Sequence, residues 1–122
     1  MKLNDKVYAL ELDLRKYGKL RAGKIGYTTQ QMPKRIAGFR FSGHLKDKEK
    51  LVKQVFVSES ILAKSIERIA KEIAILRGYE KINNKNLGQG FSEWFNCSGE
   101  QIKSCILQAY KIVRKEIKAN EK

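Results

Sequence analysis

A period-two pattern near the N-terminus constrains the fold of this chain most strongly. Residues 6–14 alternate between two sets of side chains, and this alternation predicts a β-strand with one buried face. A turn at Tyr17-Gly18-Lys19 follows, and residues 20–27 predict a second strand that closes a hairpin with the first. The alternating sets of the first strand are Val7, Ala9, Glu11 and Asp13 against Tyr8, Leu10, Leu12 and Leu14.

The hairpin is followed by a turn, a short helix and a third strand. Thr29 is a predicted cap for a helix near residues 31–39, since Thr accepts hydrogen bonds from helix-start amides. A charged loop follows over residues 43–48. Residues 51–57 are rich in apolar and β-branched side chains, and they predict the third strand.

The second half of the chain is dominated by helical patterns. Apolar residues at helical spacing predict an amphipathic helix over residues 60–77, with Ser58 or Ser60 as its cap and Gly78 as its stop. Residues 79–90 predict a polar loop, and residues 91–96 a short extended segment.

A capping box opens the final helix. Ser98 and Gln101 have the spacing at which each side chain bonds the other residue's backbone amide. The predicted buried stripe of this helix is Ile102, Cys105, Ile106, Ala109, Ile112 and Val113.

These elements predict an α+β fold in which a small, antiparallel or mixed three-stranded sheet is flanked by helices. The 122 residues, 42% of them hydrophobic, suit one domain over residues 1–122. Its core spans about residues 6–113, and the charged tail over residues 115–122 is expected to fray.

The charge balance points to a polyanionic partner. Lysine and arginine number 26 against 13 acidic residues, which gives a formal net charge of +13. Nucleic acid is the commonest such partner, and an anionic membrane surface is the main competitor. No apolar stretch is long enough to span a bilayer, and the first residues lack the apolar core of a signal peptide.

The two cysteines indicate a reducing compartment. Cys97 and Cys105 form no CxxC pair, and with one histidine in the chain they cannot build a structural zinc site. Helical rise is expected to hold them too far apart for a disulfide, so reduced thiols are predicted.

Several short motifs, in order, resemble the GIY-YIG nuclease superfamily. Val7-Tyr8 occupies the place of the first motif, and Lys24-Ile25-Gly26-Tyr27-Thr28 resembles a Lys-Ile-Gly-x-Thr variant of a phage-associated branch. Arg35 matches the family's arginine after the hairpin, and Glu67 its metal-binding glutamate. Glu93-Trp94-Phe95 resembles a further motif of the same branch.

The resemblance implies a metal-dependent DNA endonuclease that hydrolyses phosphodiester bonds. Glu67 would bind Mg²⁺ or Mn²⁺, an ion that keeps most of its waters and needs few protein ligands. Arg35 would neutralise transition-state charge, and Tyr8 would take the proton of the attacking water with Lys24 beside it. Tyr27 or His44 could assist proton transfer.

The expected partner is double-stranded DNA, with no membrane association, and the protein is expected to be a monomer or a weak homodimer. Its compartment would be the cytoplasm of a bacterial or phage-infected cell, or the nucleus of a eukaryotic host. The predicted DNA-binding residues are Lys19, Arg21, Lys34, Arg40 and Lys46.

Other interpretations of the same residues stay open. Arg40 rivals Arg35, and Glu72 rivals Glu67. Glu67 and Lys71 could instead form an ordinary i,i+4 pair on a solvated helix face. Because Lys24 stands where the family usually has tyrosine, the second hypothesis is a catalytically inactive nucleic-acid-binding protein on the same fold. A third is a basic adaptor for an acidic protein or a membrane.

Overall fold

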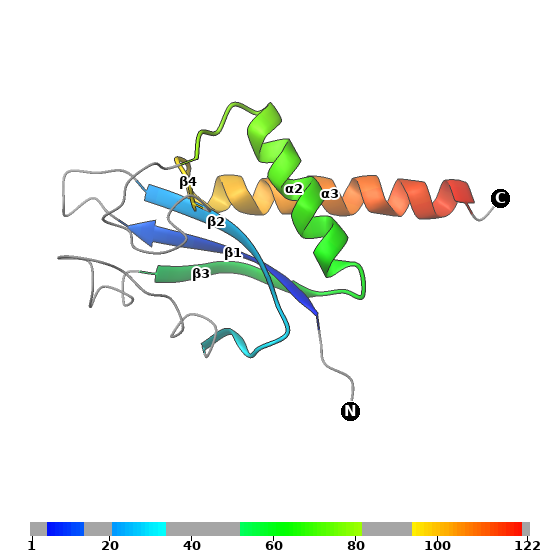
Figure 1. The fold of residues 1–122 in the computed structure, drawn as a ribbon, viewed down its shortest axis with the longest axis horizontal. Helices are drawn as coiled ribbons and strands as arrows, with labels where there is room; N and C mark the ends of the chain where they lie inside the picture. The colour runs from blue at the N-terminus through cyan, green and yellow to red at the C-terminus, as the bar shows by residue number, and fades with distance from the viewer. Residues whose placement is uncertain (1–4, 14–20, 34–51, 82–93, 121–122) are drawn as a thin grey trace.

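The computed structural model describes residues 5–13, 21–33, 52–81 and 94–120, and within them it has an α+β fold. Figure 1 shows a sheet with two long helices stacked against it. The elements, in chain order, are β1 (Lys6–Asp13), β2 (Arg21–Thr28), β3 (Val52–Glu59), α2 (Ala63–Leu76), β4 (Trp94–Phe95) and α3 (Gly99–Asn120).

The sheet has four antiparallel strands in the order β3-β1-β2-β4. β1 and β2 form the predicted hairpin, in register from Lys6 opposite Thr28 to Asp13 opposite Arg21. β3 pairs along the other side of β1. The three-stranded sheet expected from the sequence gains a fourth strand because Trp94 and Phe95 pair with Lys24 and Gly23 of β2. A strand of two residues is too short to show a period-two pattern.

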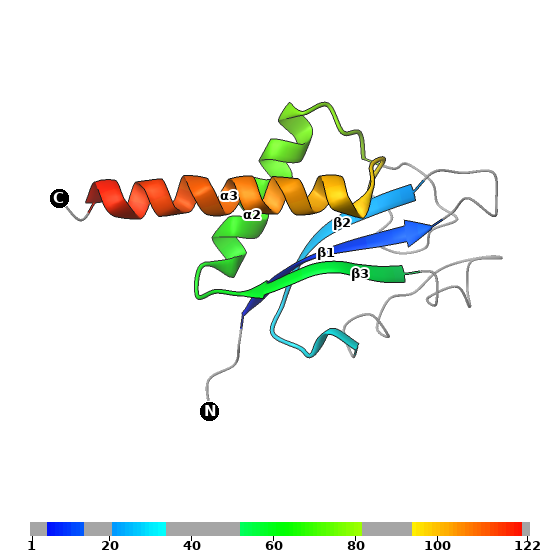
Figure 2. The same cartoon turned by 180° about the vertical axis from the view of Figure 1, so that it is seen from behind.

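Helices α2 and α3 cover one face of the sheet, and the views from front and back agree on this (Figures 1 and 2). Val7 and Ala9 of β1 and Ile25 of β2 point into the core on this side. The buried positions of α2 are mainly alanines, which let α3 approach closely. From α3, the predicted stripe is buried at Ile102, Cys105, Ile106, Ala109 and Val113.

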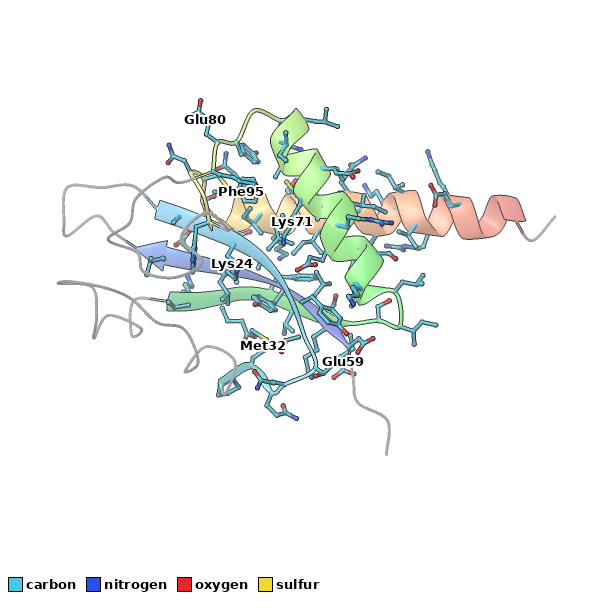
Figure 3. All side chains as sticks on the ribbon, viewed as in Figure 1. Lys24, Met32, Glu59, Lys71, Glu80 and Phe95 are labelled. Atoms are coloured by element: carbon cyan, nitrogen blue, oxygen red, sulfur yellow. The ribbon has the colours of Figure 1, made fainter. Side chains whose placement is uncertain are left out.

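The opposite face of β1 is also buried. Tyr8, Leu10 and Leu12 have no exposed surface, although they lie outside the core formed with the helices. Met32 is buried too, and it lies on the side of the sheet away from the helices (Figure 3). The helix predicted near residues 31–39 is described only at its first turn, residues 32–33, and its remainder lies outside the described residues.

The start of α2 corrects the predicted cap. The N-cap is Leu62 and no side chain caps the helix, so neither Ser58 nor Ser60 has that role. β3 continues to Glu59, and a turn separates it from the helix. In that turn the Ser60 hydroxyl accepts a hydrogen bond from the Leu62 amide at 3.0 Å.

The end of α2 follows the prediction. Gly78 has φ of 86°, the left-handed conformation that favours glycine. Its amide donates a hydrogen bond to the Ile75 carbonyl at 3.0 Å, and the Tyr79 amide donates one to the Ala74 carbonyl at 3.1 Å. This pair of bonds is a Schellman motif, so the sequence identified the stop correctly.

The predicted capping box opens α3. The Ser98 amide donates to Gln101 Oε1 at 2.8 Å, and the Gln101 amide donates to Ser98 Oγ at 3.2 Å. The Gly99 amide donates to Glu11 Oε1 at 2.9 Å, which ties the helix start to β1. α3 continues to Asn120, so the tail expected to fray is helical over most of its length. Among the described residues, no helix combines the length and apolar character needed to cross a membrane.

Candidate functional site

Tyr8 and Gly26 form a cross-strand pair in which the tyrosine ring occupies the space beside the glycine. They are directly opposite each other in β1 and β2, so both face the same side of the sheet. A Cβ atom on Gly26 would overlap the Tyr8 ring at Cζ, Oη and Cε1. The Tyr8 ring therefore lies across the glycine backbone, and Gly26 is needed because no side chain fits beneath the ring.

Lys24 lies on β2 two residues before Gly26, so it faces the same side of the sheet as Tyr8. Its strand partners are Leu10 of β1 and Trp94 of β4. Lys24 Nζ lies 6.0 Å from the centroid of the Trp94 indole ring, at the outer range of a cation–π contact. The lysine is only 3% exposed, so its ammonium group is covered and does not project freely from a strand edge.

Tyr27 points to the other face, toward α2. Its hydroxyl donates a hydrogen bond to Asp5 Oδ1 at 3.1 Å, and Lys64 Nζ of α2 lies 5.8 Å from its ring centroid. Desolvation raises the pKa of Tyr27, and the hydrogen bond and charge of Asp5 and the charge of Glu67 raise it further. Tyr27 is therefore a neutral phenol at physiological pH, suited to donating a hydrogen bond.

Glu67 lies in a shallow hollow on α2, beside Tyr27 of β2. The hollow has a volume of about 410 Å³ and is lined by Lys64, Ser65, Glu67, Arg68 and Lys71. The Glu67 side chain is 22% exposed, and its Oε2 atom lies 3.5 Å from Lys71 Nζ. The ordinary i,i+4 pair anticipated from the sequence is therefore present, but it is set among further cations.

Comparison with known proteins agrees with this architecture. The family model of the T5orf172 domain matches residues 7–109. The chain belongs to the T5orf172 domain family. T5orf172 domains are GIY-YIG-related and nuclease-like, and this agrees with the resemblance to the GIY-YIG superfamily found in the sequence. No curated protein and no solved structure matched the chain in the other two comparisons.

The T5orf172 match includes every residue predicted to be catalytic, and the structure places four of the six as two pairs. Tyr8 and Lys24 share the face away from the helices, whereas Tyr27 and Glu67 lie on the helix side. Arg35 and His44 lie outside the described residues. Of the predicted DNA-binding residues, Arg21 begins β2, and the others also lie outside the described residues, namely Lys19, Lys34, Arg40 and Lys46.

Sequence reasoning missed three residues that surround the helix-side pair, Tyr27 and Glu67, in this T5orf172 domain. Asp5 accepts a hydrogen bond from the Tyr27 hydroxyl, and Lys64 and Arg68 line the hollow around Glu67. The signal for the two cations was available, because both lie within one turn of Glu67 on the same helix. The signal for Asp5 was weaker, since it depends on the register of the hairpin.

The described residues limit how this T5orf172 domain could hold a metal ion. Among them, no group of three or more His, Cys, Asp and Glu side chains is positioned to hold an ion. Glu67 offers one carboxylate in an open hollow. That donor fits Mg²⁺ or Mn²⁺, hard ions that retain waters and take ligands from substrate phosphates, and it does not fit zinc.

Proposed function

We propose that this T5orf172 domain is a metal-dependent endonuclease of the GIY-YIG type that hydrolyses phosphodiester bonds in double-stranded DNA. The observation that carries the proposal is the family match, which spans Tyr8, Lys24, Arg35 and Glu67 in a single domain family. The formal net charge of +13 supports it, because neutralising phosphates is the main source of affinity for DNA.

In this proposal Glu67 would hold Mg²⁺ or Mn²⁺ in the hollow on α2. The ion would polarise the phosphoryl oxygen and stabilise the leaving oxygen. Arg35 would neutralise charge that builds on the phosphate. Tyr27 stays protonated because its pKa is raised, and its single O–H would turn from Asp5 to donate a hydrogen bond to a phosphate oxygen. Proton transfer from the attacking water by Tyr8 or His44 stays a prediction from the sequence.

One observation favours a second candidate, a DNA-binding protein that does not cleave. Tyr8 has no exposed surface and Lys24 is 3% exposed, so neither reaches solvent. A proton acceptor must approach the water that it activates, and burial opposes this role. On this alternative the Tyr8–Gly26 pair and Lys24 stabilise the sheet, and the basic surface binds phosphates.

Plasmid cleavage distinguishes the two candidates. Supercoiled plasmid is incubated with the wild type in Mg²⁺, in Mn²⁺ and in EDTA, and nicked and linear products are separated on a gel. The nuclease proposal predicts cleavage with metal and none with EDTA. Arg35→Ala and Glu67→Ala are each expected to lower the rate by about 10²-fold or more. Binding without cleavage in every divalent ion would establish the alternative.

A further inference from the structure

One face of α2 carries a row of cations around Glu67. Lys64, Arg68 and Lys71 line the same hollow as Glu67. Their spacings of three, four and seven residues place them on one helix face. Figure 3 labels Lys71 on this helix. None of these three cations belongs to the sequence-predicted DNA-binding set, which lies earlier in the chain.

The three cations differ in how they are engaged. Lys71 Nζ lies 3.5 Å from Glu67 Oε2, so part of its charge is neutralised. Lys64 Nζ lies 5.8 Å from the Tyr27 ring centroid, which holds its ammonium group near the sheet end of the hollow. Arg68 is exposed on the same face, one residue after Glu67. The hollow therefore has a net positive charge with one carboxylate inside it.

The length of this row suits a nucleic-acid strand. From Lys64 to Lys71 the helix rises about 10 Å, at roughly 1.5 Å per residue. A strand of B-DNA presents one phosphate per about 3.4 Å of duplex axis, so about three phosphates occupy the same length. Lysine ammonium and arginine guanidinium groups both bind phosphate oxygens, with arginine able to form two parallel bonds.

We propose that the α2 face formed by Lys64, Arg68 and Lys71 binds the phosphate backbone of DNA next to Glu67. The inference rests on the proposed function for its partner, DNA, but not on cleavage. The positive charge of this face is complementary to the phosphates of DNA. The Glu67 carboxylate is the one negative charge among the residues that line the hollow. In the absence of a divalent ion, Glu67 repels the phosphates that its neighbours attract, so it weakens binding while the cations strengthen it.

Salt-dependent binding tests the cations without any need for catalysis. The variant Lys64→Ala/Arg68→Ala is compared with Lys111→Ala/Arg114→Ala, which removes the same types of charge from exposed positions on α3. Fluorescence anisotropy measures the affinity for a short labelled duplex in EDTA. The plot of log affinity against log salt is expected to become shallower by about 2 for the α2 variant, because each lost phosphate contact contributes about 0.9.

The control double variant is expected to keep the wild-type slope. Because Lys64 contacts Tyr27, the single variants Arg68→Ala and Arg114→Ala repeat the comparison without disturbing that contact. The α2 single variant should lose about 1 in slope and the α3 one close to none. Equal slopes for α2 and α3 variants would overturn the inference, since the binding would then follow net charge alone.

Glu67 gives an independent test of opposite sign. In EDTA, Glu67→Gln is expected to bind the duplex about two- to fivefold more tightly, the size of an exposed charge interaction. Glu116→Gln removes a carboxylate from an exposed position on α3 and is expected to leave affinity unchanged. If both variants gain equally or neither gains, the repelling carboxylate in the phosphate path is contradicted.

These measurements separate the inference from the proposed nuclease activity. A wild type that binds DNA but does not cleave it, with selective loss in the α2 variants, sustains the α2 surface and contradicts the nuclease. A wild type that cleaves, with equal slopes for the α2 and α3 variants, contradicts the α2 surface and sustains the nuclease. A wild type with no affinity for DNA contradicts both.

Discussion

At the scale of single residues, the Tyr8–Gly26 pair gives the glycine of the Lys-Ile-Gly segment a steric reason. The tyrosine ring occupies the space in which any Cβ on residue 26 would lie. The sequence predicts both residues on neighbouring strands, but it does not show which residue packs against Gly26. Only the register, which sets Tyr8 directly opposite Gly26, identifies the partner that requires the glycine.

Substitution of Gly26 should destabilise the sheet through this ring. Gly26→Ala is expected to cost about 1–3 kcal/mol of unfolding free energy, the usual cost of overpacking, measured by urea denaturation. The cost should shrink in a Tyr8→Val background, because valine favours a strand but does not reach across residue 26.

Gly78→Ala serves as the control for the Gly26 substitution. No atom lies within 4 Å of a Cβ at Gly78, and its φ is 86°. Its expected cost of about 1–2 kcal/mol comes from the backbone alone, so it should be the same in the wild-type and Tyr8→Val backgrounds. A Gly26→Ala penalty that is equally unaffected by the Tyr8→Val substitution would contradict the steric account.

The Cys97 thiol makes stability depend on alkaline pH. Burial, followed by the charges of Cys105 and Glu11, raises the pKa of Cys97 from 9.0 to about 12. Below pH 9 the thiol is protonated in both the folded and unfolded states, so it adds no pH dependence. Between pH 9 and pH 12 the unfolded state releases its proton first, and unfolding becomes easier as the pH rises.

We therefore expect Cys97→Ala to flatten the alkaline part of the stability curve. Urea unfolding of the wild type and the variant is compared at neutral pH and at several values between pH 9 and pH 12. The wild type should lose more unfolding free energy over that window, whatever the variant's stability at neutral pH. Parallel losses in the two proteins would show that Cys97 does not titrate with a raised pKa in the folded state.

At the scale of elements, the hairpin and most local signals were predicted correctly, but the pairing of β4 and the start of α2 were not. The capping box at Ser98 and Gln101 and the stop at Gly78 depend on neighbours in the chain, so the sequence is enough to locate them. β4 lies within the short extended segment predicted over residues 91–96, but the sequence did not show that this segment would pair with β2. The missing cap of α2 has the same origin, because the length of β3 moves the helix start past Ser60.

The capping box gives a prediction at this scale. Gln101→Ala removes the side chain that accepts a hydrogen bond from the Ser98 amide. The substitution is expected to cost about 0.5–1 kcal/mol of unfolding free energy. Gln108→Ala, at an exposed interior position of α3, should be neutral or slightly stabilising because alanine favours helices. Thermal unfolding of both variants provides the comparison, and equal stabilities would show that the box contributes nothing.

At the scale of the whole molecule, the sheet divides the predicted site into two pairs. Residue parity alone could have shown that Tyr27 faces away from Lys24, since adjacent residues in a strand point to opposite faces. The sequence does not specify which face of the sheet a later helix covers. The face on which Glu67 lies could therefore not be predicted from it. The structure places Glu67 beside Tyr27 and among the cations of α2.

Glu67 is therefore central to both the proposed activity and the proposed DNA surface. The cations beside it lie within about one turn on the same helix, which makes the helix side of the sheet the place where metal, carboxylate and phosphate would meet. Glu72, the rival glutamate from the sequence, lies exposed on the same helix and outside the residues that line the hollow.

The most direct test of this account is the single-turnover rate at which a labelled duplex is cleaved in Mg²⁺ by Glu67→Gln and by Glu72→Gln. With protein in excess over DNA, the rate reports cleavage and is insensitive to tighter binding. We predict that Glu67→Gln lowers it by about 10²-fold or more, whereas Glu72→Gln stays close to the wild type. A Glu67→Gln protein that cleaves as fast as the wild type would contradict the central role of Glu67.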